Sequence, residues 1–311
     1  MRKNYTETYI YFYTMETVLI TGANGFLGQH LTKLLLQQGY RVIAAGKGEN
    51  RLPFHPNEQF VYYAFDITDD FLMQQVLQKE KPAIIVHAAA ITQVDECQLN
   101  QQKCEEVNVR ATAQLLVTAE AFCQHFIYIS TDFVFDGEKG DYQEEDNMNP
   151  LSWYGFTKVQ AESIVETSNI PFAIVRTCLV YGNTLAGTRS NIIGWVRENV
   201  ANKKNIKVVS DQWRTPTYIE DLAKGILLVI QKKATGIYHI SGKDKLTPYN
   251  MALQTAAYFN LDISFIEKVD ASTFQQAGKR PLKTGLDISK AQKELGFMPI
   301  GFNEGLQKMF S

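Results

Sequence analysis

Short apolar runs alternate with longer amphipathic stretches through the first half of the chain. The runs have the length of buried strands, and the stretches between them repeat their apolar residues at helical spacing. The predicted strands are 17–20, 41–45, 59–64, 83–87, 126–129 and 172–177. The predicted helices run from about 26 to Gly39, up to Pro82, over about 98–122 and from about 153. This order predicts an α/β fold with a doubly wound parallel sheet.

The first predicted strand leads into a glycine-rich turn, in which Gly22, Gly25 and Gly28 stand at every third position. Gly22 permits a tight turn, Gly25 lets the backbone approach a pyrophosphate, and Gly28 lets the next helix pack close to the strand. The first turn of that helix, with Phe26 and Leu27, directs its N–H groups at the phosphates. A loop that binds nothing is the alternative. The order strand, loop, helix favours a dinucleotide site and a Rossmann-like sheet.

The regular alternation ends near Tyr181. Helices are predicted around 192–200 and over 217–232, followed by a last strand at 236–240. The tail from 245 to the end mixes helices with polar loops. The segment 217–240 is therefore expected to return to the sheet.

This pattern divides the chain into three parts. We expect a dinucleotide-binding domain over 15–182, completed by 217–240, and a smaller α/β substrate-binding lobe formed by 183–216 and 241–311. Residues 1–14 are expected to be a disordered or misassigned extension, because Met15 directly precedes the first strand. An ordered edge strand is the alternative, since residues 9–13 are rich in aromatic side chains.

Composition excludes several classes of protein. The net charge is -2, so no basic field indicates nucleic acid. The longest apolar run, at 225–230, is too short to span a bilayer. The four cysteines show no C-x-x-C spacing and are expected to be reduced, small apolar residues of a cytoplasmic protein.

Residues after the other predicted strands suit the rest of a dinucleotide. About 20 residues beyond the glycine loop, where NAD-binding sheets place an acid, the chain has Lys47 and Arg51. Such cations suit a 2′-phosphate and favour NADPH over NADH, although Glu49 and a solvated loop are the competing interpretation. Asp66 can accept from an adenine amine. The candidate cofactor residues are Gly22, Asn24, Gly25, Phe26, Leu27, Gly28, Lys47, Arg51, Asp66, Ile67, Ala88, Ala89, Ala90, Asn108, Tyr154 and Lys158.

Tyr154 and Lys158 form a Y-x-x-x-K pair, whose spacing places both side chains on one face of the predicted helix. An ammonium group beside a phenol lowers its pKa, so Tyr154 can give a proton to a nascent alkoxide while a hydride reaches the carbonyl carbon. Thr131 follows the fifth strand and can polarise the same oxygen. A solvated helix pair is the alternative, but the order of these three features favours catalysis.

These motifs resemble the extended short-chain dehydrogenase/reductase family and, within it, the dTDP-4-dehydrorhamnose reductases. The resemblance covers nearly everything from Val18 to the end. It is carried by the segments 90–95, 130–137, 150–162 and 211–217, and by Arg280-Pro281 with Leu286-Asp287.

The resemblance implies reduction of the C4 ketone of a dTDP-6-deoxy-4-keto-hexose by NADPH, or sometimes NADH, to give dTDP-L-rhamnose. It implies that Tyr154 is the acid, that Lys158 tunes it and binds the ribose, and that Thr131 binds the substrate oxygen. Substrate contacts are expected at Asp95, Thr131, Asp132 and Arg280, with a helix cap as the alternative for Asp95. Some relatives need Mg²⁺, but no carboxylate cluster here demands one. The expected partner is a dTDP-sugar; a second copy of the chain is left open, and no nucleic acid or membrane is expected.

Three departures from the family pattern leave the sugar open. Phe26 stands where these reductases usually carry Gln, Arg214 replaces a glycine, and Lys283-Thr284-Gly285 is unusual before Leu286. The alternatives are a nucleotide-sugar epimerase or another nucleotide-sugar 4-keto reductase. A third alternative is an NADP-binding regulatory subunit like the beta subunit of methionine adenosyltransferase.

Overall fold

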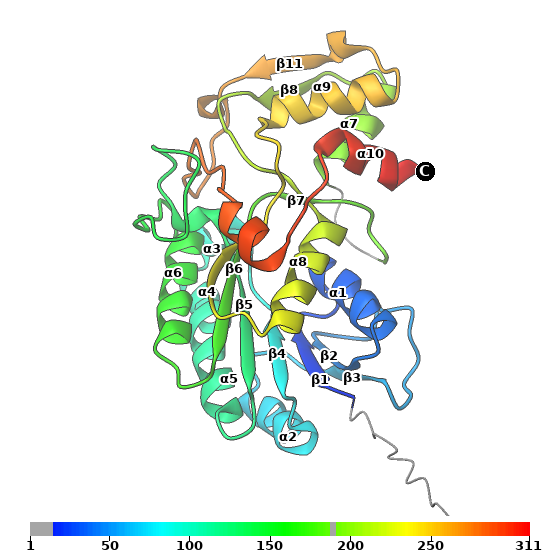
Figure 1. Ribbon diagram of the computed structural model, residues 1–311. Coiled ribbons are helices and arrows are strands. Elements are labelled where there is room, and N and C mark those ends of the chain that lie inside the picture. Colours follow the sequence, from blue (N-terminus) through cyan, green and yellow to red (C-terminus); the bar gives the residue numbers. More distant parts are fainter. Residues whose placement is uncertain (1–14, 187–190) are drawn as a thin grey trace, which may run out of the picture.

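A seven-stranded parallel sheet forms the centre of the molecule (Figure 1). The computed structural model describes residues 15–186 and 191–311, so the predictions for residues 1–14 lie outside the described residues. The strands are β1 (Thr17–Thr21), β2 (Arg41–Gly46), β3 (Phe60–Ala64), β4 (Ile84–His87), β5 (His125–Thr131), β6 (Phe172–Thr177) and β10 (Gly236–His239). Their order in the sheet is β10-β6-β5-β4-β1-β2-β3, and all neighbours are parallel. The predicted doubly wound, Rossmann-like sheet is confirmed.

Helices cover both faces of the sheet because its strands are apolar on both sides. On one face α1 (Phe26–Gln37) and α8 (Ile219–Lys232) pack against Val18 and Ile20 of β1. On the other face lie α2 (Asp70–Glu80), α5 (Ala111–Ala119) and α6 (Trp153–Glu166), which share a core with Leu19 (Figure 1). This two-sided burial explains why continuous apolar runs identified the strands.

The helix predicted over 98–122 is interrupted and begins earlier. The structure has α3 (Val94–Leu99), α4 (Gln101–Glu105) and a π-helical turn, η1 (Glu106–Arg110), before α5. The break falls at Asn100, whose backbone angles (φ -126°, ψ 60°) are not helical. The prediction of one continuous helix was wrong, because apolar spacing persists across the break.

A second group of elements lies beyond the carboxyl ends of the sheet strands (Figure 1). It contains α7 (Ile192–Ala201), β8 (Ile206–Val209), α9 (Pro248–Tyr258), β11 (Ile266–Val269) and α10 (Phe302–Phe310). The prediction that 236–240 holds the last strand was wrong, because β11 follows and pairs in parallel with β8. Both strands are short, with only one side facing the core, so their sequences carry little apolar signal.

The remaining elements are short: β7 (Val180–Tyr181), β9 (Thr217–Tyr218), η2 (Asp132–Val134), η3 (Ile263–Phe265), η4 (Ala271–Thr273) and η5 (Ala291–Leu295). The chain returns to the sheet through α8 and β10, which pairs with β6. This return supports the domain division expected from the sequence, which stays a prediction.

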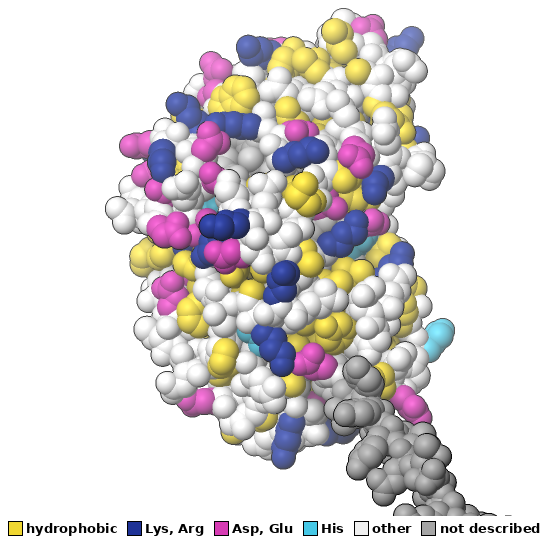
Figure 2. Space-filling model, in the orientation of Figure 1, with side chains coloured by type: hydrophobic (Ala, Val, Ile, Leu, Met, Phe, Trp, Pro, Cys, Tyr) yellow, Lys and Arg dark blue, Asp and Glu magenta, His cyan; other side chains and the backbone are white. Residues whose placement is uncertain are grey.

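Two properties of the described residues concern membranes and charged partners. No helix within 15–186 and 191–311 has the length and apolar character that a membrane crossing requires. On the face shown in Figure 2, basic and acidic side chains are interspersed. This face presents no large patch of a single sign of charge.

Candidate active site

Two adjoining cavities lie at the carboxyl edge of the sheet. The smaller has a volume of about 470 Å³ and the larger about 690 Å³. Both are lined by Gly22, Gly25, Ala88 and Ala90, so the glycine loop and the loop after β4 form their common wall. An elongated ligand that passes over the glycine loop can therefore occupy both cavities.

The glycine loop fits the diphosphate of a dinucleotide. A Cβ added to Gly22, which has φ +69°, would lie 2.8 Å from the Ala89 nitrogen, and one on Gly28 would lie 2.4 Å from the Gly22 oxygen. A Cβ on Gly25 would meet only the Gly22 oxygen, at 3.0 Å, and would otherwise point into open space. Among the described residues no side chain caps the first turn of α1. Phe26, Leu27 and Gly28 of this turn line the larger cavity, as an anion site at a helix N-terminus requires.

The far end of the smaller cavity carries the predicted charged residues, of which Lys47 and Asp66 are paired with each other. Lys47 Nζ lies 2.9 Å from the Asp66 carboxylate, and both side chains are exposed. Burial alone would raise the pKa of Asp66, but hydrogen bonds from Lys47 and Thr68 lower it. The Asp66 carboxylate lines this cavity and pairs with Lys47, and its expected contact with adenine stays a prediction. Ile67 and Arg51 also line this cavity.

Asn24 organises the loop that carries these cations. Its amide nitrogen donates to the Lys47 and Glu49 carbonyls, and its amide oxygen accepts from the Arg51 N–H at 3.0 Å. The Tyr62 hydroxyl lies 2.7 Å from the same amide nitrogen and donates to the loop carbonyls of residues 46 and 48. Asn24, predicted as a cofactor residue, here holds the loop after β2. Tyr62 was missed, although an aromatic residue with a polar tip on β3 was a visible signal.

The loop after β4 is held from behind by Asn108. The Ile91 N–H donates to the Asn108 amide oxygen at 2.8 Å, and the Asn108 amide nitrogen donates to the Ile91 carbonyl at 3.0 Å. Asn108 is buried and lines neither cavity. Its amide shapes the cavity wall, and the cofactor contact predicted for this residue stays a prediction.

The residues with candidate catalytic roles meet in the larger cavity. Thr131 ends β5, and Tyr154 and Lys158 lie in the first two turns of α6. Ser152 caps this helix by accepting from the Gly155 N–H at 3.2 Å. A Cβ on Gly155 would lie 2.2 Å from the Phe133 oxygen, so this glycine lets α6 approach the chain after β5 closely. The arrangement brings Tyr154 beside Thr131.

The phenol of Tyr154 is 7% exposed. Burial raises its pKa above the ordinary value, and the contact with the Thr131 hydroxyl acts in the opposite direction. The expected lowering of this pKa by Lys158 is not found, because burial dominates. A raised pKa keeps the phenol protonated at neutral pH, which is the form that a proton donor needs.

The ammonium group of Lys158 is held beside the strand that ends in Thr131. Its Nζ donates to the Ile129 carbonyl at 2.7 Å and lies 4.0 Å from the centre of the Tyr128 ring. Burial lowers the pKa of Lys158 to about 7, and the charge of Glu162 opposes this effect. The protonation of Lys158 thus depends on its surroundings at neutral pH.

Asp95 and Arg280, predicted as substrate residues, form a two-point ion pair. The Arg280 nitrogens lie 2.9 and 2.8 Å from the two Asp95 oxygens, and the Gly278 N–H donates to the same carboxylate. The hydrogen bond from Arg280 is the main cause that lowers the pKa of Asp95 to about 2. Gln93, and not Asp95, is the N-cap of α3. Arg280 lines the larger cavity, and Asp95 orients it from behind.

Asp132 also lines the larger cavity, but its carboxylate is buried. It accepts from the Thr284 hydroxyl and from the Cys178 thiol and lies 3.7 Å from Arg214 Nε. The Arg214 guanidinium donates to the carbonyls of residues 213, 281 and 282. Asp132 and Arg214 therefore tie the end of β5 to the segment that carries Arg280. Sequence reasoning marked Arg214 only as an unusual residue and missed the cavity residues Gln212 and Pro248, which the fold brings in from distant segments.

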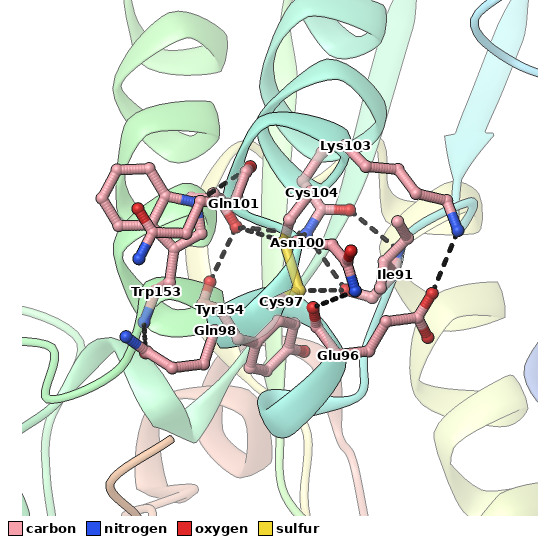
Figure 3. Close-up of a disulfide and its surroundings, with 12 residues drawn as sticks. Ile91, Glu96, Cys97, Gln98, Asn100, Gln101, Lys103, Cys104, Trp153 and Tyr154 are labelled. Atoms are coloured by element: carbon pink, nitrogen blue, oxygen red, sulfur yellow. Dashed lines mark hydrogen bonds and ion pairs between the residues drawn. A yellow bond between two sulfur atoms is a disulfide. The ribbon is translucent and has the colours of Figure 1, made fainter. Parts of the chain in front are cut away.

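Two cysteines expected to be reduced form a disulfide. Cys97 on α3 and Cys104 on α4 are bonded, with Cα atoms 5.2 Å apart (Figure 3). The correction follows from the helix break at Asn100, which a C-x-x-C search does not detect. The pair is buried in one apolar cluster with Tyr154, beside which it lies in Figure 3. Cysteine usage therefore gives no support to a cytoplasmic location.

Opening this disulfide is expected to lower the free energy of unfolding by about 2–3 kcal/mol, because the cross-link restricts the unfolded chain between residues 97 and 104. Chemical denaturation with and without dithiothreitol measures the difference. The double variant Cys97→Ser/Cys104→Ser serves as a control and should not respond to the reductant. Equal stability of the wild-type protein under both conditions would contradict the expectation.

Within the described residues, no group of three or more His, Cys, Asp or Glu side chains is arranged to hold a metal ion.

Comparisons with known proteins are consistent with this geometry. The family model of the RmlD substrate binding domain matches residues 15–311. The dTDP-4-dehydrorhamnose reductase of Aggregatibacter actinomycetemcomitans is 30% identical over 311 residues, covering 95% of this chain and 98% of that protein. The methionine adenosyltransferase 2 subunit beta of Bos taurus is 31% identical over 280 residues, covering 88% and 81%.

A solved structure extends the likeness to the fold. The dTDP-4-dehydrorhamnose reductase from Bacillus anthracis, in complex with NADP, aligns with a TM-score of 0.82 at 28% identity. The alignment covers 95% of this chain and 99% of that chain.

Proposed function

The chain belongs to the family of the RmlD substrate binding domain, and from this premise we propose that it is an NADPH-dependent reductase of a nucleotide-sugar ketone. The proposed substrate is a dTDP-6-deoxy-4-keto-hexose, reduced at C4 as in dTDP-L-rhamnose biosynthesis. One observation carries the proposal: Tyr154 and Thr131 face a cavity whose wall is the glycine loop. A ketone in this cavity would lie between the proton donor and the site proposed for the dinucleotide.

The residues of the chain have distinct roles in this reaction. NADPH, when bound along the glycine loop, would supply the hydride. Tyr154 gives its proton to the carbonyl oxygen as negative charge develops there, and the Thr131 hydroxyl donates a hydrogen bond to the same oxygen. The Lys158 ammonium stabilises the phenolate that remains on Tyr154. All three side chains are buried at the wall of the larger cavity, where few protein groups compete for the proton.

The choice of NADPH is supported by the two cations at the outer end of the smaller cavity, Lys47 and Arg51. The variant Lys47→Ala/Arg51→Ala is expected to raise the KM for NADPH by about tenfold or more, with little effect for NADH, because these cations would pair with a 2′-phosphate that NADH lacks. Steady-state kinetics with both cofactors measure the effect.

A matched control removes two exposed lysines far from the cofactor, in Lys204→Ala/Lys207→Ala, and should leave both KM values unchanged. If Lys47→Ala/Arg51→Ala raised KM for NADPH and NADH equally, the assignment to the 2′-phosphate would fail.

The identity of the sugar is tested by NADPH oxidation with dTDP-4-keto-6-deoxy-L-lyxo-hexose and with other nucleotide-linked 4-keto sugars. The proposed function predicts the highest kcat/KM for the dTDP-linked deoxysugar. Highest activity with a different base or sugar would favour another nucleotide-sugar 4-keto reductase. Interconversion of sugars without net oxidation of added NADPH would favour an epimerase.

A non-catalytic role is the second candidate, because the methionine adenosyltransferase 2 subunit beta of Bos taurus is as similar to the chain as the bacterial reductase. A regulatory subunit would bind the dinucleotide without turnover. Thr131, Tyr154 and Lys158 all line the larger cavity, and this supports catalysis over regulation.

A further inference from the structure

A buried ion pair lies behind Lys158. Glu162 and Arg176 have side chains that are 0% and 1% exposed, and Arg176 Nη2 lies 2.7 Å from Glu162 Oε2. Arg176 Nε lies 3.1 and 3.2 Å from the two carboxylate oxygens. The Arg176 guanidinium also donates to the Glu144 carbonyl and contacts the Met148 sulfur. The carboxylate of Glu162 is therefore held in one orientation by a fully buried partner.

The same carboxylate reaches the strand that positions Lys158. The Ser130 hydroxyl donates to Glu162 Oε1. Ser130 lies between Ile129, whose carbonyl accepts from Lys158, and Thr131, whose hydroxyl faces Tyr154. Glu162 thus fixes the stretch of β5 on which both interactions depend. It also lies one helical turn beyond Lys158 on α6, so both side chains share a face of the helix.

The other groups around the ammonium of Lys158 carry no charge to balance it. From β5 it faces the Tyr128 ring, and the protonated phenol of Tyr154 lines the same cavity. On β4, burial and the charge of Lys158 lower the pKa of His87 to about 3, so that ring is neutral. Among the described residues, Glu162 is the group whose charge favours the ammonium form of Lys158.

We propose that Glu162, held by Arg176 and Ser130, is a positioning residue that sets the charge and the place of Lys158. The proposal rests on the proposed function for its link to catalysis. Glu162 lines neither cavity, so it acts through Lys158 and not on the substrate. This role explains why Glu162 and Arg176 are buried although neither residue lines a ligand cavity.

The variant Glu162→Gln removes the negative charge and keeps the shape of the side chain. Without that charge the ammonium form is less stable, so the pKa of Lys158 falls below its wild-type value of about 7. We expect a fall of about one unit or more, the usual effect of a nearby charge. Turnover that needs the ammonium form would then decline at a lower pH, and the alkaline limb of the kcat profile would shift in the acid direction.

Two further variants keep the test decisive. Glu162→Gln leaves Arg176 buried without a charged partner, so Glu162→Gln/Arg176→Met, which removes both charges, is made in parallel. Glu166→Gln is the matched control, because Glu166 lies one turn farther along α6 and is exposed. Titration of Lys158 is followed by NMR of isotope-labelled lysine side chains, and the kcat profile is measured separately.

The proposal predicts that Lys158 titrates at lower pH in the Glu162 variants and at the wild-type pH in Glu166→Gln. If Lys158 titrated as in the wild type in a folded Glu162→Gln, the proposal would be overturned. Glu162→Gln/Arg176→Met removes one charge of each sign and should show a smaller fall. A wild-type protein without turnover, combined with the predicted NMR shift, would reject the proposed function while supporting the charge assignment of Lys158.

Discussion

Replacing Tyr154 by Phe is expected to lower kcat by about two orders of magnitude or more, which is the usual contribution of a positioned proton donor. The phenol faces the larger cavity beside Thr131 and stays protonated at neutral pH because it is buried. The affinity for NADPH should stay within about twofold of wild type, since removal of one hydroxyl leaves the glycine loop unchanged. Steady-state NADPH oxidation and equilibrium binding measure the two quantities.

The matched control is Tyr218→Phe, which removes the hydroxyl of another buried tyrosine that lines neither cavity. It should keep kcat and KM. Turnover that survived Tyr154→Phe would show that another group supplies the proton.

Replacing Gly25 by Val is expected to weaken NADPH binding by about 100-fold or more. The backbone of Gly25 (φ -76°, ψ 170°) is extended and open to any residue, so the fold should persist. The new side chain would fill the groove beside the first turn of α1, where a diphosphate would accept from N–H groups. Charge-assisted hydrogen bonds contribute about 1.5–3 kcal/mol each, and loss of one or two gives this factor.

Equilibrium titration with NADPH measures the loss, and thermal unfolding shows whether the fold is retained. Gly285→Ala is the control, because a Cβ there meets only side-chain atoms at 3.2 Å and beyond, away from the groove. Wild-type affinity in Gly25→Val would place the diphosphate elsewhere.

The parallel sheet was predictable because its strands are buried on both faces and therefore appear as continuous apolar runs. Neighbouring residues of β1 show this two-sided burial, because Val18 and Leu19 enter opposite layers of the core. The small sheet of β8 and β11 was not predictable on the same basis, since each strand has exposed residues on its outer side. The break at Asn100 was hidden because a single non-helical residue leaves the apolar spacing almost unchanged.

The residues of the candidate site also divide into those that the sequence predicts and those whose partners only the fold reveals. Sequence motifs identify Thr131, Tyr154 and Lys158, because their spacing and their position after a strand carry the signal. Motifs do not show which polar groups are already paired: Asp66 with Lys47, and Asp95 with Arg280. Those pairs join segments up to 185 residues apart, so only the folded chain reveals them.

The pairing of the buried groups behind the site could not be predicted from the sequence either. Glu162 belongs to a recognisable helix motif, but its partner Arg176 is on the next strand, and no local pattern links the two. The disulfide between Cys97 and Cys104 likewise depends on how α3 and α4 fold back on each other. Long-range pairing of this kind decides which residues face the ligand and which ones position it.

We propose that Tyr154 supplies the proton when a hydride passes from NADPH to a nucleotide-sugar ketone. The most direct test uses NADPH that carries deuterium in place of the transferred hydrogen, together with dTDP-4-keto-6-deoxy-L-lyxo-hexose. The sugar product is then examined by mass spectrometry and NMR. We expect the wild-type protein to give a sugar product labelled at C4, and Tyr154→Phe to give almost none. Binding of NADPH without label in the sugar, or equal labelling by both proteins, would contradict the proposed role of Tyr154.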